Sequence, residues 1–596
     1  MTTDDLTAHP QHQQSTREPA AATGADPTDR DAKSEPENAP APAPPATATR
    51  PRPTRIVRRA PGFGGMIGAL LFFCLAQSPS LLPRTWLLQG VVAGITAACG
   101  YGLGASAAAI ARAIGPASWS TPRSRRAWWT LGALGALLVG VFLMLGRGWQ
   151  NDVRALMGMT EPVAWDVALI LLLGVTVAVV FVLLARVIRL GSRRLGRALD
   201  RFIPRRIAYL GGAVVVGLIV LGLVQGVLWD GFISGMNKAS SLTNGGTPPG
   251  VVQPVAPTRS GGPQSSVPWS TLGYEGRAFI GTGPDEQALT AFNRTPATPP
   301  IRVYAGLDSA DSMQRQVDLA MAELDRTGAW QRKVLAVITT TGTGWVDPAI
   351  ADSLEYVWNG DTAEVAVQYS YLPSWMSFLV DKSKAAQAAA ALIGAVHEKW
   401  ASLPAATRPK LFVAGESLGA YGTDSVFADV QQVTAETDGA LKVGPPNADT
   451  LWRSISAGRD AGSPIWLPVV DNGRTVRFAD RPSDLQSPDS PWSTPRMVYL
   501  QNSSDPVVWW TPDLLLHRPE WLDSPRGPDV SSSMNWFPVV TFWQVTVDLA
   551  FADGVPVGHG HRYGSDAVDG WVALGAPATW TASDTRALRA VIDELP

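Results

Sequence analysis

The sequence predicts an N-terminal all-α transmembrane bundle of about five helices, followed by an α/β domain with a mainly parallel sheet. Two observations lead to this fold class. Five long apolar segments occupy the N-terminal part of the chain, and each reaches the ~20 residues that a helix needs to cross the hydrocarbon core. From Trp269 onward, short apolar runs alternate with helical patterns, which is typical of parallel strands joined by helices.

The composition fits a chain that lies partly in a membrane and excludes some partners. Charged residues make up only 17% of the 596 residues, and the formal net charge is −2, so no basic surface for nucleic acid is expected. Cys74 and Cys99 are the two cysteines, and both lie in apolar N-terminal segments. No group of His, Asp and Glu has the spacing of metal ligands, so we expect no metal and no cofactor.

Changes in composition divide the chain into four parts. Residues 1–55 are rich in Pro, Ala, Thr and charge without apolar periodicity, which predicts a disordered tail. Residues 56–236 form the bundle, residues 237–268 are a Gly-, Ser-, Thr- and Pro-rich linker, and residues 269–596 are the α/β domain. The five predicted spans are Gly62–Leu82, Trp86–Ile110, Ala127–Leu145, Val163–Val187 and Ile207–Trp229.

Arginines in the loops predict the orientation in the membrane. They cluster before the first span, between the second and third spans, and between the fourth and fifth spans, whereas the alternate loops hold few. Positive charge marks the cytoplasmic side, so the N-terminus is expected in the cytoplasm. Five crossings then place the α/β domain outside the cytoplasm, in a multi-pass protein of the cell membrane.

The elements of the α/β domain follow one another at regular spacing, with a Pro- and Trp-bearing insertion at Gly444–Pro495 where a lid could lie. Its strands are predicted at Ile301–Gly306, Val334–Thr340, Val365–Tyr371, Lys410–Ala414, Ala440–Val443 and Met497–Gln501. Its helices are predicted at Met313–Arg326, Pro348–Trp358, Lys382–Ser402 and Ser583–Leu595. The segment Asn535–Ala550 also looks helical, which leaves no clear final strand before the last histidines.

The strand at Lys410–Ala414 runs into Gly415-Glu416-Ser417-Leu418-Gly419, followed by small residues. This is the layout of a nucleophile elbow, a tight strand-to-helix turn that exposes a serine hydroxyl. Ser417 is therefore the candidate nucleophile. The amide of Leu418, at the start of the helix, would stabilise an oxyanion.

A nucleophilic serine needs a base and an acid, which in this arrangement follow it along the chain. His559 and His561 lie in a Gly-rich loop near the C-terminus. We favour His559, because Gly-His-Gly recurs around the histidine of many α/β-hydrolases, and keep His561 as the alternative base. Asp505 is the predicted acid, since it stands just past a strand end. Weaker alternatives for the acid are Asp513, Asp523 and Asp548.

Other segments are expected to complete the site. The Thr-Gly loop that follows the strand at Val334–Thr340 could bring a second backbone amide, from Thr341 or its neighbour, to an oxyanion hole. Aromatic side chains near strand ends predict the substrate pocket, namely Trp345, Tyr371 and Trp375.

Several long motifs together resemble a family of actinobacterial membrane α/β-hydrolases, in which a multi-helix membrane domain precedes a lipase-like catalytic domain. The resemblance extends from about Pro61 to the C-terminus and implies an α/β-hydrolase fold with esterase or lipase activity. The motifs that carry it are Thr341–Pro348, Gln368–Trp375, Gly415–Gly419, Ser504–Trp510, Trp536–Trp543 and Gly558–Gly564.

The expected function is therefore that of a membrane-anchored serine hydrolase, which cleaves an ester through an acyl-enzyme on Ser417. Envelope lipid is a candidate substrate, because the site would lie beside a bilayer. Two alternatives stay open: an extracytoplasmic acyltransferase that uses the same triad, and a non-catalytic membrane scaffold or transport component. Lipid or another acyl ester and the bilayer are the expected partners, and the sequence gives no oligomeric state.

Overall fold

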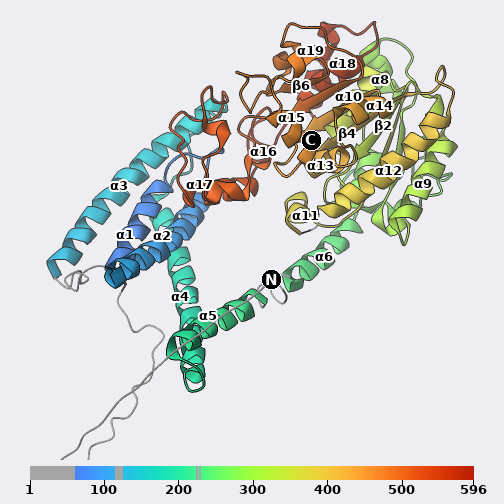
Figure 1. Cartoon of the computed structure of the whole chain (residues 1–596). Helices are drawn as coiled ribbons and strands as arrows, with labels where there is room; N and C mark the ends of the chain where they lie inside the picture. Colours follow the sequence, from blue (N-terminus) through green and yellow to red (C-terminus); the bar gives the residue numbers. More distant parts are fainter. Residues whose placement is uncertain (1–60, 115–124, 223–225, 227–229, 381, 596) are drawn as a thin grey trace, which may run out of the picture. The chain divides into compact units, whose positions relative to one another are not determined.

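The computed structural model describes residues 61–114, 125–222, 226, 230–380 and 382–595. Figure 1 labels the helices and strands within these ranges. The predicted tail, residues 1–55, lies outside the described residues.

The N-terminal part is helical, as the apolar segments predict. Three of its helices, α2, α3 and α4, are long and apolar enough to cross a membrane, which supports membrane association. Small residues bring α1 and α2 together, since a Cβ added at Gly68 would clash with the carbonyl oxygen of Gly100. The helices are α1 (Phe63–Leu75), α2 (Trp86–Ile114), α3 (Arg125–Leu156), α4 (Val167–Leu199), α5 (Arg205–Gly222) and α6 (Asp230–Asn244).

The first predicted span differs from expectation, and the fifth is described only in part. Helix α1 has 13 residues, about 20 Å of helix, which is short of the ~30 Å hydrocarbon core. It ends because the chain turns after Leu75, where the amide of Gln77 donates to the carbonyl of Cys74. The fifth predicted span coincides with α5, but most of residues 223–229 lie outside the described part.

The α/β domain contains a seven-stranded sheet in the order β1-β3-β2-β4-β5-β7-β6, and every neighbouring pair is parallel. Because all strands run the same way, their carboxyl ends and the loops that follow them gather at one edge of the sheet. The strands are β1 (Ile301–Ala305), β2 (Val334–Thr339), β3 (Thr362–Val367), β4 (Lys410–Glu416), β5 (Gly439–Val443), β6 (Val476–Ala479) and β7 (Arg496–Leu500).

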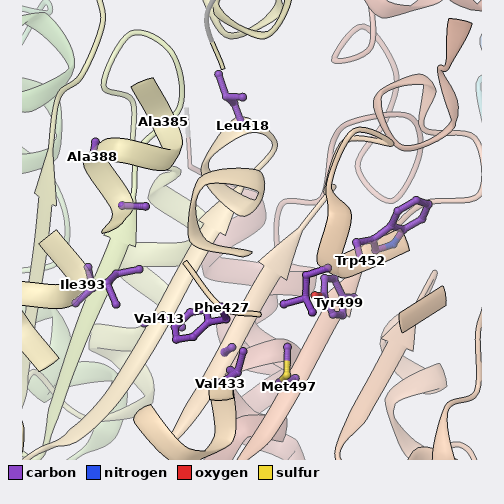
Figure 2. Close-up of a cluster of buried hydrophobic side chains, with 14 of the residues drawn as sticks. Ala385, Ala388, Ile393, Val413, Leu418, Phe427, Val433, Trp452, Met497 and Tyr499 are labelled. Carbon is purple, nitrogen blue, oxygen red and sulfur yellow. The ribbon is translucent and has the colours of Figure 1, made fainter. Parts of the chain in front are cut away.

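Helices cover both faces of this sheet. Successive residues of a strand point to opposite faces, and each face has its own buried core: Leu335 and Val337 of β2 join one cluster, while Ala336 joins the other. Figure 2 shows part of the first cluster, where Ile393 of α12 lies near Val413 of β4. The helices are α7 (Gly273–Gly281), α8 (Glu286–Asn293), α9 (Met313–Thr327), α10 (Pro348–Val357), α11 (Ser374–Val380), α12 (Ser383–Ser402), α13 (Leu418–Asp424), α14 (Val430–Glu436), α15 (Thr450–Ala457), α16 (Pro506–Trp509), α17 (Val540–Leu549), α18 (Asp566–Gly575) and α19 (Ala582–Asp593).

Two strands depart from the sequence-based expectation. Strand β3 begins at Thr362, three residues before the predicted start, and ends at Val367. Tyr369 and Tyr371, which the prediction includes in the strand, therefore lie in the loop that follows it. Strand β6 lies inside the predicted insertion Gly444–Pro495 and forms the edge of the sheet beside β7. The helix expected near Asn535–Ala550 is present as α17.

The predicted linker is more ordered than its composition suggests. Helix α6 continues to Asn244, and Arg259 forms a β-bridge with Arg302 of β1. The buried carboxylate of Glu323 on α9 accepts hydrogen bonds from the hydroxyl of Ser265 at 2.8 Å and from the amide of Ser266 at 2.8 Å. Polar residues of the linker therefore satisfy a buried charge.

Helix α17 is hydrogen-bonded to the segment that follows α1. The amide of Gln544 donates to the carbonyl of Ser78 at 2.9 Å, and the hydroxyl of Ser80 donates to the carboxylate of Asp548. Burial raises the pKa of Asp548 to about 6, although the nearby positive charge of Arg84 lowers it. Removal of the N-terminal part would expose this polar face, so the experiments below use the full chain.

Candidate active site

Ser417 lies at the turn between β4 and α13, at the carboxyl edge of the sheet. Its backbone has φ 53° and ψ −119°, a strained conformation for a residue with a side chain. The strain is held by packing: a Cβ at Gly415 would clash with Gly419, and a Cβ at Gly419 would clash with the carbonyl of Thr339 on β2. The two glycines are therefore required for the elbow to pack against the neighbouring strand.

Asp505 follows β7 and is hydrogen-bonded to His561. Its Oδ2 atom is 2.7 Å from Nδ1 of His561 and accepts a hydrogen bond from the hydroxyl of Tyr563 at 2.6 Å, while Oδ1 accepts from the amide of Val507 at 2.7 Å. An ionised carboxylate only accepts hydrogen bonds, so Nδ1 of His561 carries a proton. Nε2 of His561 then has no partner among the described residues.

His559 belongs to a different pair. Its Nδ1 atom is 2.9 Å from Oδ2 of Asp529. The same carboxylate accepts hydrogen bonds from the hydroxyls of Ser503 and Ser504. The structure therefore places two His–Asp pairs on either side of Gly560, and Asp505 pairs with His561 and not with the favoured His559.

Gly560, between the two histidines, is held from both sides by the loop that carries Asp505. The side-chain amide of Asn502 donates to its carbonyl oxygen at 2.9 Å, and its own amide donates to the hydroxyl of Ser504 at 2.9 Å. Because the glycine has φ 54°, a side chain there would add strain. These bonds fix the histidine loop against the acid loop.

A cavity of about 420 Å³ brings the candidate residues together. Ser417, His561, Thr341 and Trp345 line it, while Asp505 lies behind His561 and is fully buried. This volume falls within the usual range of small-molecule sites, about 300–1,000 Å³.

Of the two other predicted pocket residues, the structure describes the side chain of Tyr371, which lies outside the cavity lining. The hydroxyl of Tyr371 donates to Asp308 at 2.6 Å, and Tyr371 does not line the cavity. Burial and this carboxylate raise its pKa to about 12. Trp375 is on α11, and its side chain lies outside the described part, although the preceding Ser374 does line the cavity.

The predicted oxyanion donors are placed differently from each other. Leu418 is the first residue of α13, so its amide has no partner within the helix. The amide of Thr341, in contrast, donates to the carbonyl of Trp345 at 3.0 Å, and the amide of Gly342 donates to the hydroxyl of Ser374 at 3.2 Å. Thr341 lines the cavity, but its amide is already bonded within its own loop.

Carboxyl groups that the sequence did not single out also line the cavity. They are Asp347, Glu416, Asp553 and Asp593, and the neighbouring cation is Arg562. The pKa of Glu416 is raised well above its ordinary value, first by burial and then by the charge of Asp347. Only Glu416, beside the serine in the elbow motif, could have been suspected from the sequence, because the others come from segments far apart in the chain.

The electrostatics of His561 reflect this acidic lining. Burial has the largest single effect and lowers the pKa of its imidazole, but the carboxylates of Asp505, Asp553 and Asp347 together outweigh burial. The net result is a pKa above the ordinary value of 6.5. The protonated imidazole is therefore stabilised in this pocket.

A seven-stranded parallel sheet with helices on both faces, preceded by apolar helices, defines the class: an α/β-hydrolase-type protein with a membrane-associated N-terminal region. Family comparison makes this more specific. A model described as "Alpha/beta-hydrolase family" matches residues 301–588, and one described as "Alpha/beta-hydrolase family N-terminus" matches residues 77–284. The chain belongs to this family, as its motifs predict. Neither the curated proteins nor the solved structures give a significant match.

Proposed function

We propose that the protein is a membrane-anchored serine hydrolase that cleaves an ester through an acyl-enzyme on Ser417, with His561 as the base and Asp505 as the acid. The observation that carries the proposal is the pairing of Asp505 with His561, because His561 lines the same cavity as Ser417 and its Nε2 has no hydrogen-bond partner among the described residues. His559 is bound to Asp529 and is not in the cavity lining.

In the proposed reaction, Nε2 of His561 takes the proton from the hydroxyl of Ser417 as its oxygen attacks the ester carbonyl. Asp505 holds the imidazole by its Nδ1 proton and stabilises the cation that forms. The amide of Leu418 and the hydroxyl of Thr341 donate to the oxyanion. His561 then protonates the leaving alcohol, and a water molecule activated by the same imidazole releases the acid and restores Ser417.

The proposal extends to where the site works. Arginines cluster from Arg112 near the end of α2 to Arg126 at the start of α3, and again from Arg186 in α4 to Arg206 at the start of α5, which favours the cytoplasmic side for both connections. The α/β domain would then act outside the cytoplasm, where envelope lipid is a candidate ester. Reporter fusions after residue 269 test this orientation, and a reporter active only in the cytoplasm would overturn it.

The test of catalysis is labelling of the full chain by a fluorophosphonate probe, with hydrolysis of uncharged esters as the second readout. Uncharged esters suit a lining that carries four carboxyl groups. Ser417→Ala should abolish both signals. Ser374→Ala is the matched control, because Ser374 lines the same cavity, and it should retain labelling. A folded wild-type chain that neither labels nor hydrolyses any ester in a graded series would refute the proposal.

A further inference from the structure

The N-terminal helices contain a second cavity, a groove of about 360 Å³. Helix α4 supplies much of its lining, including Leu171, Val175 and Val179, while Phe73 of α1 and Ala97 of α2 are buried residues of the lining. Nearly all of the surface is apolar carbon. Because α2, α3 and α4 are apolar enough to cross a membrane, lipids are the molecules that we expect around this groove.

One end of the groove is polar. Arg186 is the only charged residue in the described lining, and its guanidinium donates to the hydroxyl of Tyr101 at 3.4 Å. The same hydroxyl accepts from the amide of Gly62 at 3.2 Å. The lining thus combines a long apolar wall with a single cation at its end, and none of the described lining residues is a carboxylate.

The groove is long enough to hold an acyl chain of one leaflet. From Leu171 to Arg186, α4 rises about 22 Å, at about 1.5 Å per residue. Half of the ~30 Å hydrocarbon core is about 15 Å. An extended acyl chain of one leaflet can therefore lie along the groove with its headgroup at the level of Arg186.

We propose that this groove binds an acyl chain of an anionic phospholipid from the surrounding bilayer, with the lipid phosphate paired to the guanidinium of Arg186. The apolar wall replaces the neighbouring lipid tails, and the cation lacks a protein carboxylate in the lining to neutralise it. An anionic headgroup is favoured over a zwitterionic one, because its phosphate has no ammonium group competing for the charge. The site is separate from the serine cavity and does not depend on the proposed reaction.

The experiment is native mass spectrometry of the full chain, loaded from nanodiscs that hold phosphatidylglycerol and phosphatidylcholine with identical acyl chains. The wild type should retain phosphatidylglycerol preferentially. Arg186→Gln should reduce this preference about fivefold, the effect of one arginine near a membrane surface. Arg197→Gln is the matched control on the same helix, exposed and outside the groove, and should leave the preference unchanged.

A second pair of variants tests the groove itself. Val179→Trp fills it, whereas Val180→Trp adds the same bulk at an exposed position outside the lining; the two valines are 49% and 56% exposed. Val179→Trp should lose the bound lipid, and Val180→Trp should keep it. Equal retention by both variants, equal loss of preference in both arginine variants, or a lipid-free dimer as the main species would each overturn the proposal.

Discussion

The choice between the two histidines can be tested by matched substitutions, His561→Gln and His559→Gln. Each removes one imidazole from the same loop and replaces it with a side chain that cannot act as a base near neutral pH. Among the described residues, His561 is the histidine that lines the cavity with Ser417, and its Nε2 has no hydrogen-bond partner. Loss of a triad base typically costs about 10⁴- to 10⁶-fold in turnover, so His561→Gln should reduce ester hydrolysis by that factor.

His559→Gln should act on stability instead. The His559 imidazole contributes a single bond to the carboxylate of Asp529, and a hydrogen bond to a charged group contributes about 1.5–3 kcal/mol. The replacement amide can still donate there, so we expect at most this loss of unfolding free energy and turnover within about tenfold of the wild type.

The assay combines initial rates on an uncharged ester, fluorophosphonate labelling and the thermal midpoint of the full chain in one detergent. Rates are compared only between variants that remain folded. The reasoning is refuted if a folded His559→Gln is inactive while His561→Gln keeps near-normal turnover. If both variants lost turnover to the same large extent and kept the thermal midpoint of the wild type, the assignment of His561 alone as the base would also be contradicted.

Three further predictions concern the elbow, the pH profile and the core. Gly419→Ala should destabilise the chain by about 3 kcal/mol, because the added methyl group is overpacked against β2. Gly394→Ala lies in open space on α12 and should stabilise the chain by up to about 1 kcal/mol. Urea unfolding measures both changes. Activity should rise with pH through the raised pKa of His561, because only the neutral ring accepts a proton. Asp553→Asn removes a charge that raises this pKa, so the rise in activity should move to lower pH. A rise at unchanged pH would show that Asp553 does not act on the base. Arg302→Met should cost about 3–5 kcal/mol by leaving its buried acidic partners unpaired, and an unchanged urea midpoint would contradict this.

Much of the architecture follows from local pattern. Strands β1, β2, β4, β5 and β7 are mostly apolar runs bounded by turns, so the sequence predicts each of them within a residue or two. The sequence does not predict β6, because it has only four residues and lies among prolines, and only pairing with β7 makes it a strand. The end of α1 was misjudged, since apolar composition continues past Leu75 while the hydrogen-bonded turns that stop the helix carry no strong sequence signal.

Local residue patterns predict the fold class, the strand-to-helix turn at Ser417 and the place of Asp505 just past a strand end, because each depends on residues close together in the chain. Which histidine meets Asp505 depends instead on tertiary contacts. His559 and His561 are separated by one glycine, and both lie in the same loop. Hydrogen bonds from Asn502 and Ser504 to Gly560 fix that loop so that each ring faces a different carboxylate. That choice depends on contacts between segments some 56 to 58 residues apart, which no local pattern specifies.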